Sequence, residues 1–474
     1  MRELGVLLAG RFVSGGRTLT IASPYDGREV ARVGRADTDT LQQALNAAAA
    51  ARPAMAALPP HRRAAVLETA AAEVEQRRDE LATVLVEEAG KPVSLARIEA
   101  ERCVETLREA ARVARTPACE LLDLGGFPSG EGRMGLLRRV PVGVVVGITP
   151  FNFPLNLVAH KLAPAVAAGC PVVLKPASQT PSPALLLGEI LCRAGLPEGA
   201  LSVVPCAGPE AGVLLADPRV RLVTFTGSAE VGWQLKRTAW DRRVCLELGG
   251  NAAVIVEPDA GDLVAVARRI AVGAYAYAGQ SCISVQRVLV HKAIAAPFRE
   301  ALVAAAESFP TGDPAVEGVM CGPMISAADA DRIEAWSAEA KAAGARALTP
   351  HRRQGTVVSP LLLEGVPPTA RLWAEEAFAP VAAMAVYESF EQALAIANES
   401  RFGLQAGLFT SDLRKLQRAF EVLEVGGIVQ GDIPSWRTDP MPYGGVKDSG
   451  VGREGPRWAV EEMTEPRLLV LRRE

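Results

Sequence analysis

Residues 142–149 read VGVVVGIT, and this apolar stretch decides the fold that the sequence predicts. Short runs rich in valine are typical of strands that are buried on both faces of a parallel sheet. Three similar runs follow, separated by helical patterns; we expect strands at 171–175, 201–205 and 221–226 and helices at 183–194 and 210–216. Strands that alternate with helices predict an α/β fold with a doubly wound parallel sheet, covered by helices on both faces.

The same alternation begins again near Glu247 and continues to Gly431, which predicts a second sheet of this kind. Its first elements are expected as a strand at 252–256, a helix at 262–278 and a strand at 286–291. Upstream of both sheets, alanine, leucine, glutamate and arginine recur at helical spacing, and we expect helices at 37–51 and 61–88.

Two segments outside these series predict a small β element. Around residues 125–135 the composition changes to glycine, proline and serine, which is typical of a loop or hairpin. Residues 465–472 have the pattern of a strand and no other strand lies close by in sequence. This terminal strand must therefore pair with a distant segment or with another subunit.

The composition indicates a globular protein with a sizeable core. At 474 residues the chain is long enough for two or three domains, and 49% of its residues are hydrophobic and 22% charged. A net charge of −3 gives no electrostatic footprint for nucleic acid, and no apolar run approaches a membrane helix. The N-terminus shows no signal peptide. Eight cysteines without a CxxC pair and four scattered histidines indicate free thiols in the cytoplasm and no metal site.

The usual dinucleotide-binding fingerprint, GxGxxG after a strand, is absent. Residues 225–232, FTGSAEVG, do follow a predicted strand and open a helix, but they lack the Lys-Ser/Thr of a P-loop. Gly227 and Ser228 therefore belong either to a tight strand-to-helix turn or to a helix N-terminus whose amides face a pyrophosphate.

Cys282 is the candidate nucleophile. Cysteine is most often a small buried hydrophobe, but the preceding GQS, residues 279–281, is unusual for a core strand. A nucleophilic thiolate needs exposure and nearby amides or positive charge. Glu247 lies 35 residues upstream, between apolar strand residues and glycines. It is either a base with a raised pKa or a helix cap or surface charge.

Asn152 follows the first predicted strand, within the sequence PFNFP at 150–154. An asparagine in this position can cap the next helix. It can equally point its amide at an oxygen that becomes negatively charged during a reaction. The residues alone leave both roles open.

Taken together, these segments resemble the aldehyde dehydrogenase superfamily over about residues 37–465 and in the same chain order. Seven sequences carry the resemblance, namely TPFNFPL at 149–155, VLKPA at 173–177, FTGS at 225–228, ELGG at 247–250, GQSC at 279–282, EAF at 376–378 and PYGGVKDSG at 442–450. The most similar branch contains lactaldehyde, non-phosphorylating glyceraldehyde-3-phosphate and phosphonoacetaldehyde dehydrogenases, on the evidence of residues 153–161, 282–287 and 441–445.

The resemblance implies a role for each matching residue. Cys282 would be the nucleophile that forms a thiohemiacetal, Asn152 would stabilise the oxyanion, and Glu247 would activate the water that releases the acid. The cofactor, NADP or NAD, would be bound by Thr149, Pro150, Lys175, Ser178, Gly208, Phe225, Gly227, Ser228, Leu248, Glu376 and Phe378. NAD-preferring members commonly place a glutamate where Ser178 stands, and its carboxylate would repel a 2′-phosphate. We therefore expect NADP to be accepted.

A substrate tunnel is also implied by the resemblance, with walls from Phe153, Asn156, His160, Ser281, Ile283 and Arg437. Asn156 and His160 share a helix face at i, i+4 spacing, and the Arg437 guanidinium could clamp an anion through two parallel hydrogen bonds. These residues predict a short, polar, anionic aldehyde as the substrate. His160 could instead be bonded within the core, and Arg437 could be a plain surface arginine.

Three structural parts follow from the resemblance. Residues 1–120 and 141–246 would bind NAD(P), residues 247–430 would form the catalytic domain, and residues 121–140 and 431–474 would pair across subunits of a homodimer or homotetramer. Two other functions stay open. A CoA-acylating dehydrogenase generally lacks the base, and a non-catalytic binding or structural protein that kept the fold would show damage at Cys282, Glu247 or Asn152.

Overall fold

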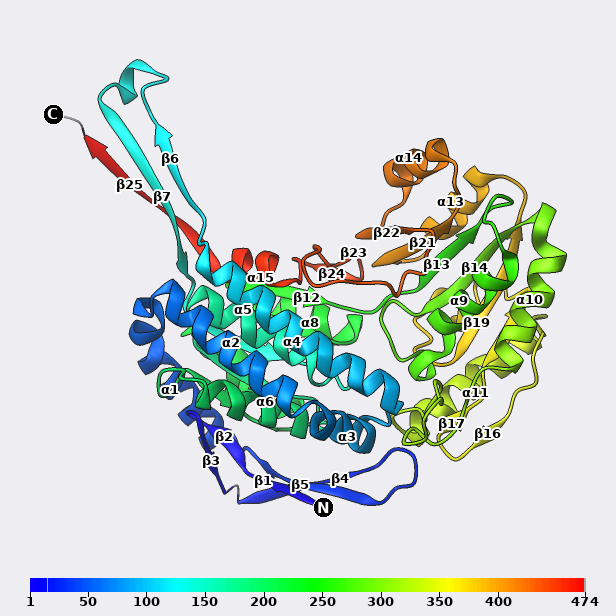
Figure 1. Ribbon diagram of the computed structural model, residues 1–474, viewed down its shortest axis with the longest axis horizontal. Helices are drawn as coiled ribbons and strands as arrows, with labels where there is room; N and C mark the ends of the chain where they lie inside the picture. The colour runs from blue at the N-terminus through cyan, green and yellow to red at the C-terminus, as the bar shows by residue number, and fades with distance from the viewer. Residues whose placement is uncertain (15, 473–474) are drawn as a thin grey trace.

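The computed structural model of the chain describes residues 1–14 and 16–472 and contains two α/β lobes with a projecting arm (Figure 1). One lobe is built on an eight-stranded sheet and the other on a seven-stranded sheet, and three antiparallel strands form the arm. The predicted α/β class with two parallel-rich sheets and a small β element is therefore confirmed.

Five parallel strands form the centre of the first sheet, in the order β12-β11-β8-β9-β10. They span Val144–Ile148 (β8), Val172–Lys175 (β9), Leu201–Val203 (β10), Val220–Thr226 (β11) and Arg243–Glu247 (β12). Short antiparallel strands flank them, namely β24 (Gly450–Val451) beside β12, and β2 (Val6–Leu8) and β3 (Arg11–Val13) beyond β10. The strand order reverses between β8 and β11.

Eight helices belong to the described part of this lobe. They are α1 (Thr38–Ala57), α2 (Pro60–Gln76), α3 (Arg78–Ala89), α4 (Val93–Arg115), α5 (Asn156–Ala168), α6 (Ser182–Arg193), α7 (Gly212–Ala216, after the 3₁₀ turn Pro209–Ala211) and α8 (Ala229–Thr238). The expected single helix at 61–88 is wrong, because the backbone leaves the helical conformation at Arg77 and two helices meet there. A one-residue interruption leaves the apolar spacing almost unchanged, so the sequence pattern does not reveal it.

The second sheet has the order β15-β18-β19-β14-β13-β21-β22, and only β15 is antiparallel. Its strands span Ala252–Val256 (β13), Val285–His291 (β14), Arg346–Ala347 (β15), Leu361–Glu364 (β18), Val381–Tyr387 (β19), Gln405–Phe409 (β21) and Gly427–Gln430 (β22). The helices are α9 (Leu263–Tyr275), α10 (Ala295–Glu307, after the 3₁₀ turn Lys292–Ile294), α11 (Ala327–Ala342), α12 (Arg371–Ala374), α13 (Phe390–Asn398) and α14 (Leu413–Val422). Two small strand pairs complete the lobe, β16 (Arg353–Gln354) with β17 (Val357–Val358) and β20 (Phe402–Gly403) with β23 (Val446–Lys447).

The two sheets meet through opposite edges. The first sheet presents its carboxyl edge, where β12 ends at Glu247, and the second presents its amino edge, where β13 begins at Ala252. Only residues 248–251 join these two strands. In open α/β sheets ligands bind at the carboxyl edge, where the strand order reverses. The junction of the two lobes is therefore where a site is expected.

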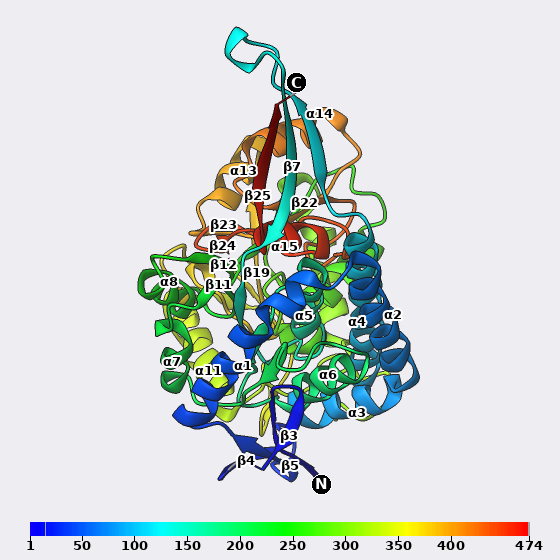
Figure 2. The ribbon, with the colours of Figure 1, turned by 90° about the vertical axis from the view of Figure 1, so that its left-hand side faces the viewer.

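The arm consists of β6 (Cys119–Asp123), β7 (Arg133–Pro141) and β25 (Thr464–Arg472), with the 3₁₀ turn Pro128–Gly130 at its tip. β25 pairs with β7 along its whole length, which confirms that the terminal strand pairs with a distant segment. The arm stands clear of the body in Figure 1, and its tip rises above the rest of the molecule in Figure 2. Residues 468–471 of β25 are each 42–54% exposed although all four are leucine or valine. An apolar edge strand of this kind is suited to a subunit contact.

The domain boundaries expected from the sequence stay predictions. β24 lies within 431–474, the segment assigned to the oligomerisation element, but pairs with β12 in the first sheet. At the N-terminus, a separate three-stranded sheet is formed by β1 (Arg2–Leu4), β4 (Arg17–Ala22) and β5 (Glu29–Arg35). Near the C-terminus, α15 (Pro456–Glu462) precedes β25. No helix among the described residues is long and apolar enough to cross a membrane.

We expect Leu469→Asp to dissociate the oligomer, because a charge cannot be buried unpaired in an apolar contact between arms. Leu413→Asp is the matched control, since Leu413 is 78% exposed on α14, away from the arm. Light scattering after size exclusion should show a mass near that of one chain for Leu469→Asp and the wild-type mass for the control. An unchanged mass for Leu469→Asp, or a monomeric wild type, would contradict the prediction.

Candidate active site

A cavity of about 360 Å³ lies at the junction of the two sheets. Its walls come from both lobes, from α4 and from the segment after β22. The lining residues that matter for the chemistry are Arg102, Phe153, Glu247, Cys282, Arg437 and Tyr443. Two of the three residues that the sequence predicts to be catalytic therefore share one cavity, and the third lies beside it.

Cys282 follows a turn with unusual backbone geometry. α9 ends at Tyr275, so the helix expected to reach residue 278 is too long. The reason is that Tyr277 and Ala278 both adopt the left-handed conformation, with φ of 53°. This conformation costs about 1–3 kcal/mol for each residue other than glycine, and such strain clusters at functional sites. The backbone therefore leaves the helical conformation several residues before Cys282.

The next two residues hold this turn in place. Gly279 has a φ of 65°, and a Cβ there would lie 2.1 Å from the carbonyl oxygen of Ala379, so only glycine fits. The buried side chain of Gln280 accepts a hydrogen bond of 2.8 Å from the backbone N–H of Ile325. These contacts explain why GQS is unusual for a core strand, since its residues build a turn instead.

The Cys282 thiol is half-buried, and its Sγ lies 2.8 Å from the hydroxyl oxygen of Tyr443. Burial raises the pKa of the thiol to about 12, although the hydrogen bond with Tyr443 acts in the opposite direction. The thiol is therefore protonated at neutral pH. Nucleophilic attack therefore requires that the thiol first lose this proton.

Glu247 is the last residue of β12 and only 6% exposed. Its Oε2 is buried and has no hydrogen-bond partner among the described residues. Burial raises the pKa of this carboxyl well above its usual range, and the nearby carboxyl of Glu454 raises it further. A buried carboxylate whose pKa is raised holds an accepted proton more strongly, so it is suited to general base catalysis.

Asn152 connects the first sheet with the turn that carries the thiol. It lies between β8 and α5, is 3% exposed, and donates a hydrogen bond of 3.1 Å from Nδ2 to the carbonyl oxygen of Gln280. A side-chain amide carries two N–H groups, so one is left for another acceptor. This placement is compatible with the oxyanion role, which stays a prediction.

The predicted cofactor residues of the first lobe gather along the carboxyl edge of its sheet. Thr149 and Pro150 follow β8, and Lys175 ends β9, with Ser178 three residues later. Gly208 lies beyond the end of β10. Phe225 lies in β11, Gly227 and Ser228 come directly after that strand, and Leu248 comes directly after β12. Ser228 is the N-cap of α8, and its side chain makes no capping bond. The helix N-terminus expected from the sequence is therefore present.

Two polar groups on this edge are poorly satisfied. The hydroxyl oxygen of Thr149 is buried and has no partner among the described residues. The Lys175 ammonium, 8% exposed, donates one hydrogen bond, of 3.0 Å, to the carbonyl oxygen of Pro176. Burial lowers the pKa of Lys175. Buried polar groups normally have partners, so this edge is chemically suited to a polar ligand.

Glu376 and Phe378 approach the same space from the second lobe. The Glu376 carboxylate accepts a hydrogen bond of 3.0 Å from the N–H of Gly250, and burial raises the pKa of this carboxyl to about 7. Phe378 has a φ of 46°, and its ring packs edge-on against Phe151 with a centroid distance of 5.9 Å. The structure therefore brings the residues of both lobes that the sequence predicts to bind the cofactor to one junction.

Of the six predicted substrate residues, five line the cavity, namely Phe153, Asn156, Ser281, Ile283 and Arg437. His160 is not among the lining residues and is 1% exposed. Its Nε2 lies 3.2 Å from a carboxylate oxygen of Asp439 and 3.1 Å from the Arg437 guanidinium, and burial lowers the pKa of the imidazole. His160 is therefore a histidine bonded within the core, as the alternative interpretation has it, and it does not line the cavity.

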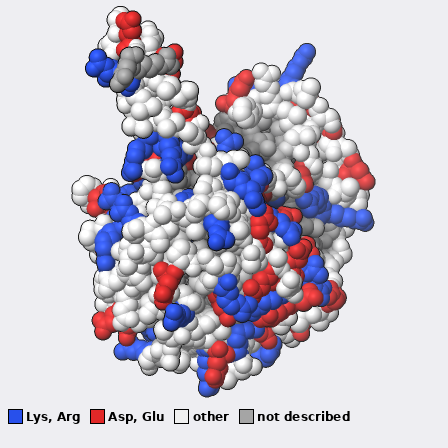
Figure 3. Space-filling view, turned by 60° about the vertical axis from the view of Figure 1, so that its left-hand side comes forward, with Lys and Arg blue, Asp and Glu red and all other residues white. Residues whose placement is uncertain are grey.

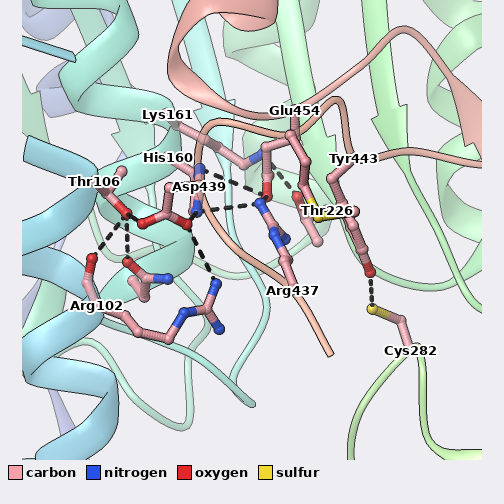
Figure 4. Close-up of polar contacts among 12 residues, drawn as sticks. Arg102, Thr106, His160, Lys161, Thr226, Cys282, Arg437, Asp439, Tyr443 and Glu454 are labelled. Carbon is pink, nitrogen blue, oxygen red and sulfur yellow. Dashed lines mark hydrogen bonds and ion pairs between the residues drawn. The ribbon is translucent and has the colours of Figure 1, made fainter. Parts of the chain in front are cut away.

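Arg437 lines the cavity, and its guanidinium is already bound by neighbouring side chains (Figure 4). Its guanidinium donates a hydrogen bond of 2.7 Å to Glu454 and lies over the ring of Tyr443, 3.8 Å from the centroid. The side chain is only 6% exposed, so Arg437 is not the surface arginine of the alternative interpretation. Its Nε has no partner among the described residues.

Arg102 is the most important residue that the sequence analysis missed. It lies on α4, lines the cavity, and its side chain is 25% exposed. One guanidinium nitrogen lies 3.4 Å from Asp439, which also lies 2.8 Å from the hydroxyl of Thr106 (Figure 4). α4 carries several arginines, and nothing in its sequence distinguishes the one that faces the cavity.

The segment assigned to the oligomerisation element also supplies site residues that the sequence analysis gave no role. Tyr443 and Glu454 both lie in it. Tyr443 belongs to the sequence PYGGVKDSG at 442–450, and its match to the family was the signal that could have identified this residue. Lys161, on α5, is buried and donates a hydrogen bond of 2.7 Å to the hydroxyl of Thr226. Together with Arg437 and His160, Lys161 lowers the pKa of Glu454, against the effect of burial, which raises it.

Comparisons with known proteins agree with this geometry. Residues 12–469 match the profile of the aldehyde dehydrogenase family. The chain is 41% identical to aspartate-semialdehyde dehydrogenase 1 of Pseudomonas canavaninivorans, over 96% of each chain. It is similar to the crystal structure of aldehyde dehydrogenase 21 from Physcomitrella patens in complex with the reaction product succinate (TM-score 0.97, 41% identity, 100% and 98% of the chains). It is also similar to glyceraldehyde-3-phosphate dehydrogenase from Methanocaldococcus jannaschii complexed with NADP (TM-score 0.92, 35% identity, 96% and 100%).

The raised pKa of Cys282 predicts how the free protein reacts with iodoacetamide. Alkylation follows the thiolate fraction, so its rate should rise about tenfold per pH unit and show no plateau below pH ~10.5. Mass spectrometry of the peptide that contains Cys282 measures the rate. Cys282→Ala provides the background from the other cysteines. A plateau between pH 8 and 9 would contradict the environment described for this thiol.

Proposed function

This chain belongs to the aldehyde dehydrogenase family, and from that premise we propose that it oxidises a short anionic aldehyde to the carboxylic acid, with NADP or NAD as the hydride acceptor. The observation that carries the proposal is that one cavity of about 360 Å³ collects the Cys282 thiol, the Glu247 carboxyl and the guanidiniums of Arg102 and Arg437. In sum, aldehyde, water and oxidised cofactor give acid, reduced cofactor and a proton.

The chemistry begins at Cys282. Its proton passes to water in the cavity and is the proton that the overall reaction releases; the sulfur then bonds to the aldehyde carbon. The carbonyl oxygen becomes negatively charged, and the second N–H of Asn152 can stabilise it. One such donor contributes about 10²–10³ in rate. Loss of hydride from the same carbon leaves a thioester on Cys282.

Glu247 completes the reaction. Its carboxylate takes a proton from water, the resulting hydroxide adds to the thioester carbon, and the carbon–sulfur bond breaks to release the acid. Glu247 then returns its proton to the sulfur, which restores both the thiol and the carboxylate. The unpartnered, buried Oε2 described above is available for that proton. A CoA-acylating enzyme would transfer the acyl group to a thiol instead and generally lacks this base, so the hydrolytic reaction is favoured.

The residues at the junction suit a nicotinamide dinucleotide, whose chemistry when bound is to accept the hydride. The unpartnered Thr149 hydroxyl and the sparsely bonded Lys175 ammonium can both bind polar groups of such a ligand. The N-terminus of α8 after Ser228 suits a pyrophosphate. Ser178 carries no charge that would repel a 2′-phosphate, which supports NADP, and the Methanocaldococcus jannaschii relative was crystallised with NADP.

The two guanidiniums support an anionic substrate. Arg437 is already paired with Glu454, so it adds positive potential and orientation more than new hydrogen bonds. Arg102 has a single partner at 3.4 Å and is partly exposed to the cavity, so its remaining N–H groups can bind a carboxylate or phosphate. The succinate complex of the Physcomitrella patens relative and the aspartate semialdehyde named for the Pseudomonas canavaninivorans relative support a carboxylate. A homodimer or homotetramer in the cytoplasm remains part of the proposal.

Arg102→Ala should raise KM for succinic semialdehyde about tenfold or more, because a hydrogen bond to a charged group contributes ~1.5–3 kcal/mol. KM for butanal, which carries no anion, should barely change. Arg108→Ala is the matched control, since Arg108 lies on the same helix but is exposed and paired with Glu75. Equal changes in KM for both aldehydes would refute an anion-binding role, and preference of the wild type for butanal would refute the proposed substrate class.

Glu247→Gln should slow release of the acid far more than hydride transfer, because an amide cannot take a proton from water. Stopped-flow absorbance should then show a burst of reduced cofactor close to one per active site, followed by slow turnover. Cys282→Ala should show neither phase while it still binds the cofactor. A Glu247→Gln enzyme without a burst would mean that Glu247 is needed before hydride transfer.

A further inference from the structure

A second cavity, of about 420 Å³, lies where the arm joins the body. It is enclosed by the turn between α1 and α2, the C-terminal ends of α4 and α5, the root of β7, and α15. It shares no lining residue with the cavity that contains Cys282. Figure 3 shows Lys and Arg side chains gathered where the arm leaves the body.

Positive charge dominates the wall of this second cavity. Five arginines line it against one acidic residue, Glu461; the arginines are Arg63, Arg112, Arg138, Arg139 and Arg457. The carboxylate of Glu461 lies 3.4 Å from Arg457, and Arg112 is paired with Glu109 outside the cavity. Three guanidiniums are then left without a carboxylate partner among the described residues.

Arg63 is bound by backbone carbonyls and has no side-chain partner among the described residues. It donates to Leu58 at 2.8 Å and Ala56 at 3.1 Å near the end of α1, and to Ala167 at 3.2 Å at the end of α5. The partial negative charge at these helix ends offsets part of its positive charge. Burial lowers the pKa of Arg63, and the neighbouring Arg138 lowers it further. The two guanidiniums therefore repel each other across the cavity wall.

Arg138 and Arg139 lie side by side at the root of β7. Arg139 donates to the hydroxyl of Thr464 at 2.7 Å and to the carbonyl oxygens of Thr464 at 2.9 Å and Glu461 at 2.5 Å, and it has no carboxylate partner in the described part of the chain. Arg138 is exposed and has no hydrogen-bond or ion-pair partner among the described residues. Its repulsion by Arg63 would be relieved by an anion bound between them.

We propose that this second cavity binds an organic phosphate. A volume of about 420 Å³ falls within the range of small-molecule sites. Arg63, Arg138 and Arg139 all line the cavity. The Arg138 guanidinium, which has no partner among the described residues, can bind phosphate oxygens through paired hydrogen bonds, and Arg63 and Arg139, which donate mainly to protein oxygens, add positive potential. Apolar side chains of Leu58, Val113 and Val460 complete the wall and can contact the organic part of the ligand. The ligand is thus a phosphate monoester with a nucleoside or sugar attached.

Calorimetric titration of the full chain tests this proposal. AMP and ribose 5-phosphate are the probes for the two kinds of ester, and adenosine and ribose are their uncharged controls. Each titration is run with and without saturating NADP, so that binding at the proposed cofactor site is recognised. We expect saturable binding of at least one phosphate ester in both conditions and none of the uncharged controls.

Arg138→Ala should weaken this binding about tenfold or more, while folding should be unaffected because the side chain is exposed and unpaired. Arg133→Ala is the matched control, since Arg133 lies on the same strand nearer the tip and does not line the cavity. Three results would overturn the proposal: no binding of either ester, binding that NADP abolishes, or binding that Arg138→Ala leaves unchanged. A change in oligomer mass on Arg138→Ala without phosphate binding would assign the arginines to a subunit contact instead and would also overturn it.

Discussion

The four residues between β12 and β13 impose the steric constraint on which the site depends. They cross from the carboxyl edge of one sheet to the amino edge of the other, and a Cβ at Gly249 would lie 2.3 Å from the Glu376 carboxylate. A Cβ at Gly250 would lie 2.2 Å from the carbonyl oxygen of Cys282. The second contact is with backbone, so only glycine fits at position 250, whereas a side chain at position 249 would displace the Glu376 carboxylate. The two sheets can therefore come close enough for Glu247, Cys282 and Glu376 to face one space, and the site exists only because of that approach.

Buried charge is the second constraint, and it follows from the first. The junction encloses Lys161, His160, Arg437, Glu454 and Glu247, all of them buried. Buried ion pairs contribute little net stability, because desolvation offsets the attraction. Their measurable effect here is on protonation. The cations keep Glu454 ionised, and that charge together with burial raises the pKa of Glu247. The cluster thereby prepares a carboxyl for proton transfer.

Sequence patterns predicted the sheets because buried parallel strands are continuous apolar runs, and 142–149 and 252–256 are of this kind. They predicted Cys282 and Glu247 because short sequences of fixed order surround both. They could not predict the break at Arg77, which leaves helical spacing almost intact, or the strained turn at Tyr277, which depends on contacts with distant residues. Arg102 was missed for a related reason: α4 carries arginines on several faces, and only its packing against α5 shows which one meets the cavity.

The fully buried helix α5 joins the two cavities. Its first turn begins four residues after Asn152, and Asn156 lines the cavity that contains Cys282. Its last residues, Ala167 and Ala168, line the cavity at the arm, where Arg63 binds the Ala167 carbonyl. A packed helix transmits displacement along its axis because the core around it cannot deform. An anion that drew Arg63 away from Ala167 would therefore act on the helix whose first turn follows Asn152 and carries Asn156, so occupancy of one cavity has a physical route to the geometry of the other.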